Sequence, residues 1–360
     1  MKYRCLFFVA GLTALVSLAQ GQVAPHSASD KDKPGKPAWR APRTADGQPD
    51  LQGVWANNTA TPMERPKELE GRTSLSDEEV AAMKKKAAEL YNGKGDAAFG
   101  DTIFQTVFAS IKGSGPASGP HIKAANEFDG GTGDYSSEWI VAREWDNRTS
   151  LITDPPDGKL PAMTSEGLAR RNASFAAMLR PAAVAADRGL QERCITFGSP
   201  QLIAGYQSYS QILQTSNSVI LLTEMIHDAR IIPLDGRPHV SPTIQGWLGD
   251  SRGHWEGDTL VVDTTNYKPM SFMAASSGKL HVIERFTRTG PESLKYEVTI
   301  DDPGTWTKPW SLMIPLKQSP NPIFEYACHE GNSGLVGILA GARAEEQAAA
   351  AAPTGNREQK

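Results

Sequence analysis

The chain has 360 residues with a formal net charge of −4, and 39% of its residues are hydrophobic. Positive and negative side chains are mixed along the sequence, which argues against a nucleic-acid partner or an anionic membrane surface. The apolar fraction and the eight tryptophans are sufficient for a sizeable core. We therefore expect a globular protein whose partner is a small-molecule ligand or substrate.

Residues 1–21 have the parts of a secretory signal peptide: a basic start, an apolar run from Cys5 to Leu18 and small residues before the expected cleavage after Gly21. The run is shorter than the roughly 20 residues that a membrane span needs, and no later segment resembles a span. The sequence thus predicts a periplasmic protein. Residues 22–47 are predicted to be a flexible linker and residues 344–360 a disordered tail.

Two cysteines, Cys194 and Cys328, remain once the signal peptide is removed. In an oxidising compartment such a pair predicts one disulfide, which the chain-entropy model values at about 4–5 kcal/mol for so long a loop. The alternative is two thiols buried separately.

Helical signals occur in the first half of the chain. Ser76-Asp77-Glu78-Glu79 is a capping box that begins a helix at about 76–92. A second helix is expected at about 164–180, where Pro181 ends it. Between them, residues 112–134 are rich in Gly, Ser and Pro and predict a long mobile loop.

From about Tyr206 onward, apolar and polar residues alternate with period two, and turn signals separate the runs. This pattern predicts a single, mainly β domain over residues 48–343: an antiparallel meander closed into a calycin-like β-barrel, with helical and loop decoration in the N-terminal half. The expected strands are Gln211–Thr215, Val219–Met225, Ala229–Leu234, Thr259–Asn266, His281–Arg288, Leu294–Ile300, Trp310–Leu316 and Ile323–Tyr326.

A Gly-x-Trp motif, Gly53-Val54-Trp55, precedes this series. It resembles the motif of calycin barrels such as the lipocalins, in which the indole packs across the barrel floor. The alternative is an ordinary buried tryptophan at the start of a strand.

Polar residues interrupt the alternation first at Glu224–Arg230. Here His227 is a candidate general base, Asp228 a carboxylate that would orient it, and Arg230 a group for an anionic substrate. The alternative is a surface turn with a solvated ion pair.

Two further polar segments contribute candidates. Asp250 and Arg252 lie in a Gly-flanked segment expected to be a polar loop at the barrel mouth, and His329 and Glu330 follow Cys328, which would hold them rigidly. Each segment also has a purely structural interpretation. The first would be an ordinary turn, and the second would be a disulfide anchor with solvated neighbours. On the strand at 281–288, one of Glu284, Arg285 and Arg288 is expected to point inward, where an unpaired charge is costly.

Cofactor and metal signals are weak. No nucleotide-binding fingerprint is present, so we expect no redox cofactor. No two histidines have metal-binding spacing, and a site made by His227, His239 and His329 has no support from the sequence. We therefore predict no metal.

Three long motifs, together with the segment 47–55, resemble a large family of exported proteins from acidobacteria and sphingomonad-type proteobacteria. The motifs are MIHDARIIPLDGRPH at 225–239, WLGDSRGHWEGDTLVV at 247–262 and YACHEGN at 326–332. The resemblance implies export and one shared fold, and it transfers neither an activity nor a catalytic residue.

The residues as a whole suggest an exported acid–base enzyme, a lyase, isomerase or hydrolase acting on a small organic molecule in a barrel pocket. A periplasmic carrier of a hydrophobic or aromatic ligand is the alternative. Convergence of the polar residues on one cavity favours the enzyme, and a cavity with purely apolar walls favours the carrier.

Overall fold

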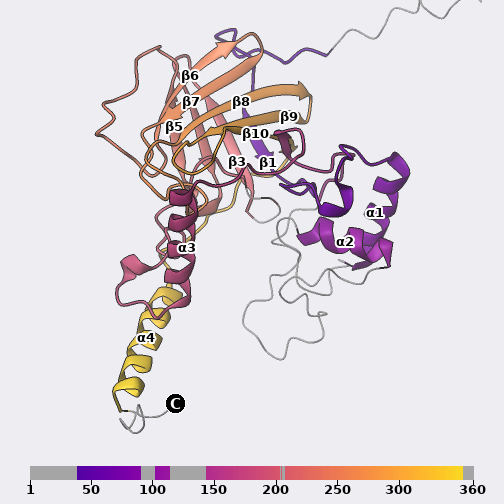
Figure 1. The fold of residues 1–360 in the computed structure, drawn as a ribbon. Helices are drawn as coiled ribbons and strands as arrows, with labels where there is room; N and C mark the ends of the chain where they lie inside the picture. Colours follow the sequence, from indigo (N-terminus) through magenta and orange to yellow (C-terminus); the bar gives the residue numbers. More distant parts are fainter. Residues whose placement is uncertain (1–38, 91–101, 114–142, 203, 205–206, 352–360) are drawn as a thin grey trace, which may run out of the picture. The chain divides into compact units, whose positions relative to one another are not determined.

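A computed structural model describes residues 39–90, 102–113, 143–202, 204 and 207–351, so the predicted signal peptide lies outside the described residues. The described part is mainly β, with one antiparallel sheet and four α-helices (Figure 1). The strands are β1 (Gly53–Ala56), β2 (Ile152–Asp154), β3 (Tyr209–Gln214), β4 (Ser218–Thr223), β5 (Ala229–Pro233), β6 (Asp250–Glu256), β7 (Thr259–Thr265), β8 (His281–Gly290), β9 (Ser293–Asp301) and β10 (Trp310–Ser319). The helices are α1 (Asp77–Leu90), α2 (Thr102–Lys112), α3 (Ser165–Leu179) and α4 (Ser333–Ala351).

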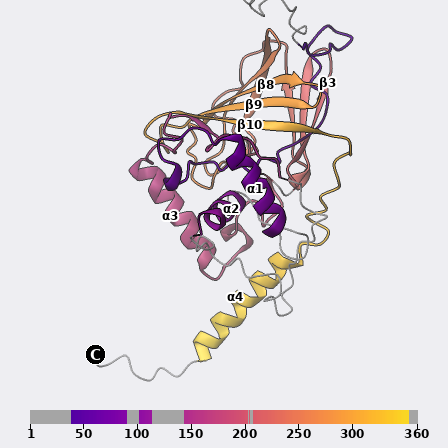
Figure 2. The same cartoon turned by 90° about the vertical axis from the view of Figure 1, so that its right-hand side faces the viewer.

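The sheet confirms the predicted antiparallel meander. Its strand order is β5-β4-β3-β1-β10-β9-β8-β7-β6, and β2 pairs with β10. Figure 2 shows β8, β9 and β10 as neighbours in this sheet. The short strand β1 joins two meanders, because it pairs with β3 on one side and with β10 on the other.

The predicted closure into a barrel is not confirmed. Among the described residues, no ladder of hydrogen bonds joins the edge strands β5 and β6. The two edges nevertheless meet through side chains. A Cβ atom added at Gly253 of β6 would lie 2.8 Å from Cγ2 of Ile232 and 2.7 Å from Cδ2 of Leu234. The sheet therefore curls far enough to bring its edges together.

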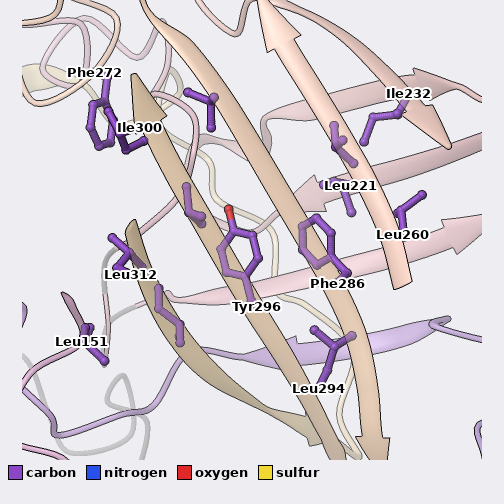
Figure 3. Close-up of a cluster of buried hydrophobic side chains, with 14 of the residues drawn as sticks. Leu151, Leu221, Ile232, Leu260, Phe272, Phe286, Leu294, Tyr296, Ile300 and Leu312 are labelled. Carbon is purple, nitrogen blue, oxygen red and sulfur yellow. The ribbon is translucent and has the colours of Figure 1, made fainter. Parts of the chain in front are cut away.

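The interior of the curled sheet is the main core. Side chains from β4 and β5 and from β8, β9 and β10 point into the same space (Figure 3). The period-two alternation places them there, since every second residue of a strand faces the same side. Members of this core from across the sheet include Leu221, Ile232, Leu260, Phe286, Leu294, Tyr296, Ile300 and Leu312.

Trp55 of the Gly-x-Trp motif is fully buried in this core. Its indole N–H donates to the carbonyl of Leu51 (2.8 Å), and the guanidinium of Arg288 lies 5.5 Å from the ring centroid. Arg288 also donates to the carbonyl of Asp50 (3.0 Å). The cation–π contact and these hydrogen bonds fasten the start of β1 to β8.

Helices α1 and α2 share a smaller core with Leu75, Met83, Phe104 and Trp145. The predicted capping box is present at the start of α1. The Ser76 N–H donates to Glu79 Oε2 (2.8 Å), and the Glu79 N–H donates to Ser76 Oγ (3.2 Å). No described helix combines the length and the apolar character that crossing a membrane requires.

Four local predictions differ from the structure. The segment 250–256 is strand β6 and not a loop, because its inward residues include the small Ser251 and Gly253, which hide the alternation. Ile323–Tyr326 forms no strand. Helix α4 continues to Ala351, into the stretch predicted to be disordered, and the apolar helix α2 was not predicted at all.

Because the sheet edges are in close contact at Gly253, we expect a single added methyl group there to lower the stability of the fold. Gly253→Ala should lower the free energy of unfolding by about 1–3 kcal/mol, the usual cost of overpacking. Gly290→Ala is the matched control, because a Cβ there would meet its nearest atom at an ordinary 3.5 Å. Denaturant unfolding of both variants measures the difference. Equal stabilities would mean that β5 and β6 do not pack as described.

Candidate functional site

A buried ion pair spans the interior of the curled sheet. Arg230 Nη1 on β5 lies 2.7 Å from Glu284 Oε2 on β8, and the two side chains are only 9% and 1% exposed. The alternation of β5 places Arg230 on the same face as the core residue Ile232. That of β8 places Glu284 between Val282 and Phe286. Glu284 is thus the inward charge that the sequence predicted for this strand.

Two hydroxyl groups complete this network. The Tyr296 hydroxyl donates to Glu284 Oε1 (2.6 Å), and Arg230 Nη1 donates to Ser199 Oγ (2.6 Å). Burial opposes ionisation of Arg230, but the charge of Glu284 outweighs it and raises the pKa of the guanidinium. Burial, reinforced by the negative charge of Glu284, raises the pKa of Tyr296. The network therefore holds a charged arginine, a carboxylate and a neutral phenol in the core.

The network lines a cavity that offers about 50 Å³ to the centre of a water-sized molecule. All the empty space in and around this cavity, including space open to solvent, amounts to about 660 Å³. We call this the inner cavity. Its polar lining includes Asp228, Arg230, Glu284, Tyr296 and Ser199. Apolar residues lie among them and comprise Trp55, Ile212, Leu221, Leu248, Phe286 and Leu316. A few polar groups set in an apolar hollow are typical of small-molecule sites.

Asp228 sits at the edge of the inner cavity. Its Oδ2 accepts hydrogen bonds from Thr196 Oγ1 (2.6 Å) and from the Phe197 N–H (3.2 Å). Burial raises the pKa of the Asp228 carboxyl, although both hydrogen bonds and the nearby Arg230 favour its charged form. A half-buried carboxyl with a raised pKa is able to donate or accept a proton closer to neutral pH than an exposed aspartate.

The expected partnership of His227 with Asp228 is not formed in the described structure. A short 3₁₀ turn, Met225–His227, precedes β5, and Ile226 and His227 have φ angles of +57° and +47°. This turn directs His227 to solvent while Asp228 turns inward. The tight turn that the sequence suggested is therefore present, but it separates the two side chains.

Asp250 and Arg252 lie on the other face of the sheet. Their neighbour Ser251 faces the core, where it shares a hydrogen bond with the buried Thr264 (3.0 Å). Arg252 Nη1 donates to Asp250 Oδ1 (2.7 Å). The Asp250 carboxylate also lies 3.0 Å from His239 Nδ1, and the other ring nitrogen of His239 lies 3.2 Å from Asp263 Oδ1. Asp250 and Arg252 thus fasten the 235–249 segment to the outside of the sheet and do not reach the inner cavity.

His329 and Glu330 are exposed and also lie away from the inner cavity. They follow Cys328, which forms the predicted disulfide with Cys194, so that prediction is confirmed. Of the seven residues proposed from the sequence, the structure places only Asp228 and Arg230 at the inner cavity. Among the described residues, no group of three or more His, Cys, Asp or Glu side chains is arranged to hold a metal ion.

Sequence reasoning missed Ser199 and Tyr296. Tyr296 occupies an ordinary inward position of β9 and gives no signal of its own, and Ser199 lies in a loop. Glu284 could be recognised as an inward carboxylate because it occupies an apolar position of the alternating pattern. Its partner Arg230 could not be recognised, because it lies 54 residues away along the chain.

Comparison of the chain with protein-family models, with curated proteins and with solved structures gives no match.

We expect the removal of one member of the buried Arg230–Glu284 pair to cause a large loss of stability. Glu284→Gln leaves the Arg230 charge without its counterion and should lower the free energy of unfolding by about 3–5 kcal/mol. Glu297→Gln breaks the half-exposed pair with Lys295 (2.9 Å) and should cost about 0–1 kcal/mol. Urea unfolding followed by tryptophan fluorescence compares the two. A cost for Glu284→Gln no larger than that for Glu297→Gln would contradict the buried pair.

The raised pKa of Asp228 predicts a pH dependence of defined sign. The folded protein binds this proton more tightly than the unfolded chain, whose aspartate keeps its ordinary value of 3.8. The resulting stabilisation is complete below the unfolded pKa and is lost as pH rises through the folded one. Asp228→Asn removes this loss, so the variant should gain stability relative to the wild type between pH 4 and pH 7. Asp235→Asn is the control, because Arg237 lowers the pKa of Asp235 and reverses the sign. A constant difference for Asp228→Asn across this range would contradict the assignment.

Proposed function

We propose that the protein is an exported acid–base enzyme that acts on a small organic molecule in the inner cavity. We further propose that the sheet rolls around this cavity as a calycin-like barrel. The observation that carries the proposal is the convergence of Asp228, Arg230, Glu284 and Tyr296, from three different strands and a turn, on one cavity whose lining is otherwise largely apolar. Buried ionisable groups with shifted pKa values gather at functional sites more often than elsewhere.

In this proposal Asp228 transfers the proton. Its carboxyl is held in place by Thr196 and Phe197, and its raised pKa suits a general acid or base. We assign this role to Asp228 and not to His227, because the imidazole is exposed. Arg230, together with the Ser199 hydroxyl, would hold a carboxylate or a developing oxyanion of the substrate.

The disulfide supports export, because such bonds persist in oxidising compartments. We therefore propose a periplasmic location, with residues 1–21 as the signal peptide, and membership of the exported family that the three motifs resemble. The reaction classes that fit are those of lyases, isomerases and hydrolases that need only proton transfer.

The apolar residues that line the inner cavity favour a second candidate function. Trp55, Leu221 and Phe286 offer a surface for an aromatic or aliphatic group, as in a carrier. A carrier would bind the same molecules without converting them, so measurement of binding and turnover in one experiment separates the two functions.

The test is a panel of C3–C8 hydroxy acids, lactones and amides incubated with the purified protein and followed by NMR, which reports both binding and product. We expect at least one compound to be converted, and Asp228→Asn to reduce turnover by about 10²–10⁴-fold, the usual contribution of a general acid or base. Asp235→Asn, an exposed matched control, should turn over like the wild type. Binding without conversion would replace the enzyme by the carrier, and full activity of Asp228→Asn would remove Asp228 from the mechanism.

A further inference from the structure

A second hollow of about 670 Å³ lies beside the end of α3 and the loops at 186–198 and 270–274. Met178, Trp247, Met270 and Met273 line it, and we call it the methionine groove. Two of these side chains, Met178 and Met273, are 52% and 45% exposed. Methionine is flexible and polarisable and adapts to apolar ligands of different shape. The groove is also as large as typical small-molecule sites.

The groove carries an excess of one positive charge. Three arginines and two carboxylates line it, and the carboxylates are engaged: Glu192 with Arg188, and Asp187 with Arg180 at 3.8 Å. The third arginine, Arg193, is half-buried and has no ion pair or side-chain hydrogen bond within the described part of the chain. Lys268, whose ammonium group lies 4.9 Å from the Trp247 ring centroid, adds positive charge nearby.

The loop that presents Arg193 is held in a fixed conformation. The next residue, Cys194, is bonded to Cys328, and the Asn332 side chain donates to the Glu192 carbonyl (2.9 Å). The Ile195 N–H closes the loop on the Leu190 carbonyl (2.9 Å). A half-buried cation on a braced loop loses little conformational entropy when it binds an anion, which favours affinity.

We propose that the methionine groove binds an amphiphilic organic anion. Its alkyl chain or ring lies against the methionines and Trp247, and its carboxylate is paired with Arg193. The charge complementarity and the volume of the groove select this occupant. The site is separate from the acid–base chemistry proposed for the inner cavity, and its test requires binding alone.

The test is isothermal titration calorimetry with octanoate, and with 1-octanol as the uncharged analogue of the same chain length. Octanoate should bind at one site, and about tenfold more tightly than 1-octanol, because a charge-assisted hydrogen bond contributes roughly a factor of ten or more. Arg193→Gln should weaken octanoate binding about tenfold and abolish the preference over 1-octanol. Arg171→Gln, an exposed arginine of α3 that does not line the groove, should behave like the wild type.

Methionine methyl NMR locates the bound molecule. In protein labelled with ¹³C at the methionine methyl groups, octanoate should shift the resonances of Met178, Met270 and Met273, and the variant Met273→Leu assigns one of them. Met225, which is buried elsewhere, should not shift. The proposal is overturned if octanoate shows no saturable binding, if Arg193→Gln binds it like the wild type, or if the groove methionines do not respond.

Discussion

The contact between Arg230 and Glu284 constrains the whole sheet. In the strand order, β4, β3, β1, β10 and β9 lie between the strands that carry these residues, yet their charged atoms are 2.7 Å apart. A flat or gently twisted sheet would hold residues so far apart in its strand order well beyond contact, because neighbouring strands are spaced by about 4.8 Å. The ion pair is therefore possible only because the sheet curls, and the packing of Gly253 against Ile232 at its edges follows from the same curvature.

This ion pair is a costly way to fill a core. Transfer of two charges from water to a protein interior costs several kcal/mol per ion, and the attraction between them only offsets this when the remaining polar atoms are satisfied. Here Tyr296 and Ser199 supply those hydrogen bonds. Apolar residues of similar size would often serve stability equally well. The presence of a charged pair in the lining of a cavity is a reason for placing function there.

The sequence was informative about strands and much less so about which polar groups meet. Alternation located most of β3 to β10, and the capping box located α1 within two residues at each end. Neighbouring residues of a strand face opposite sides of the sheet, so Asp250 and Arg252 cannot share a face with Ser251 and Gly253. Asp250 and Arg252 were expected in a polar loop at the barrel mouth, but they lie on strand β6. The inward positions of β6 belong to Ser251 and Gly253, two small residues whose pattern is hard to recognise.

The pairing of Arg230 with Glu284 lay beyond sequence reasoning for a different reason. The inward direction of Glu284 follows from its apolar neighbours Val282 and Phe286, but its partner depends on how far the sheet curls. Curvature results from the twist of every strand and from packing across the interior. The separation of His227 from Asp228 likewise depends on two residues with positive φ, Ile226 and His227, neither of which is a glycine that would signal such a turn.

A single loop links the two hollows of the molecule. Thr196 and Phe197 hold Asp228 at the inner cavity, and both also line the methionine groove, while Gly198 lines both hollows. Gly198 has a φ of +91°, and a Cβ there would lie 2.6 Å from the Ser271 carbonyl oxygen, so only glycine fits between the two walls. The disulfide at Cys194 braces the same loop from the other end. The segment from Arg193 to Gly198 therefore supplies residues to both hollows, and its fixed conformation positions the Arg193 cation on one side and the Asp228 carboxyl on the other.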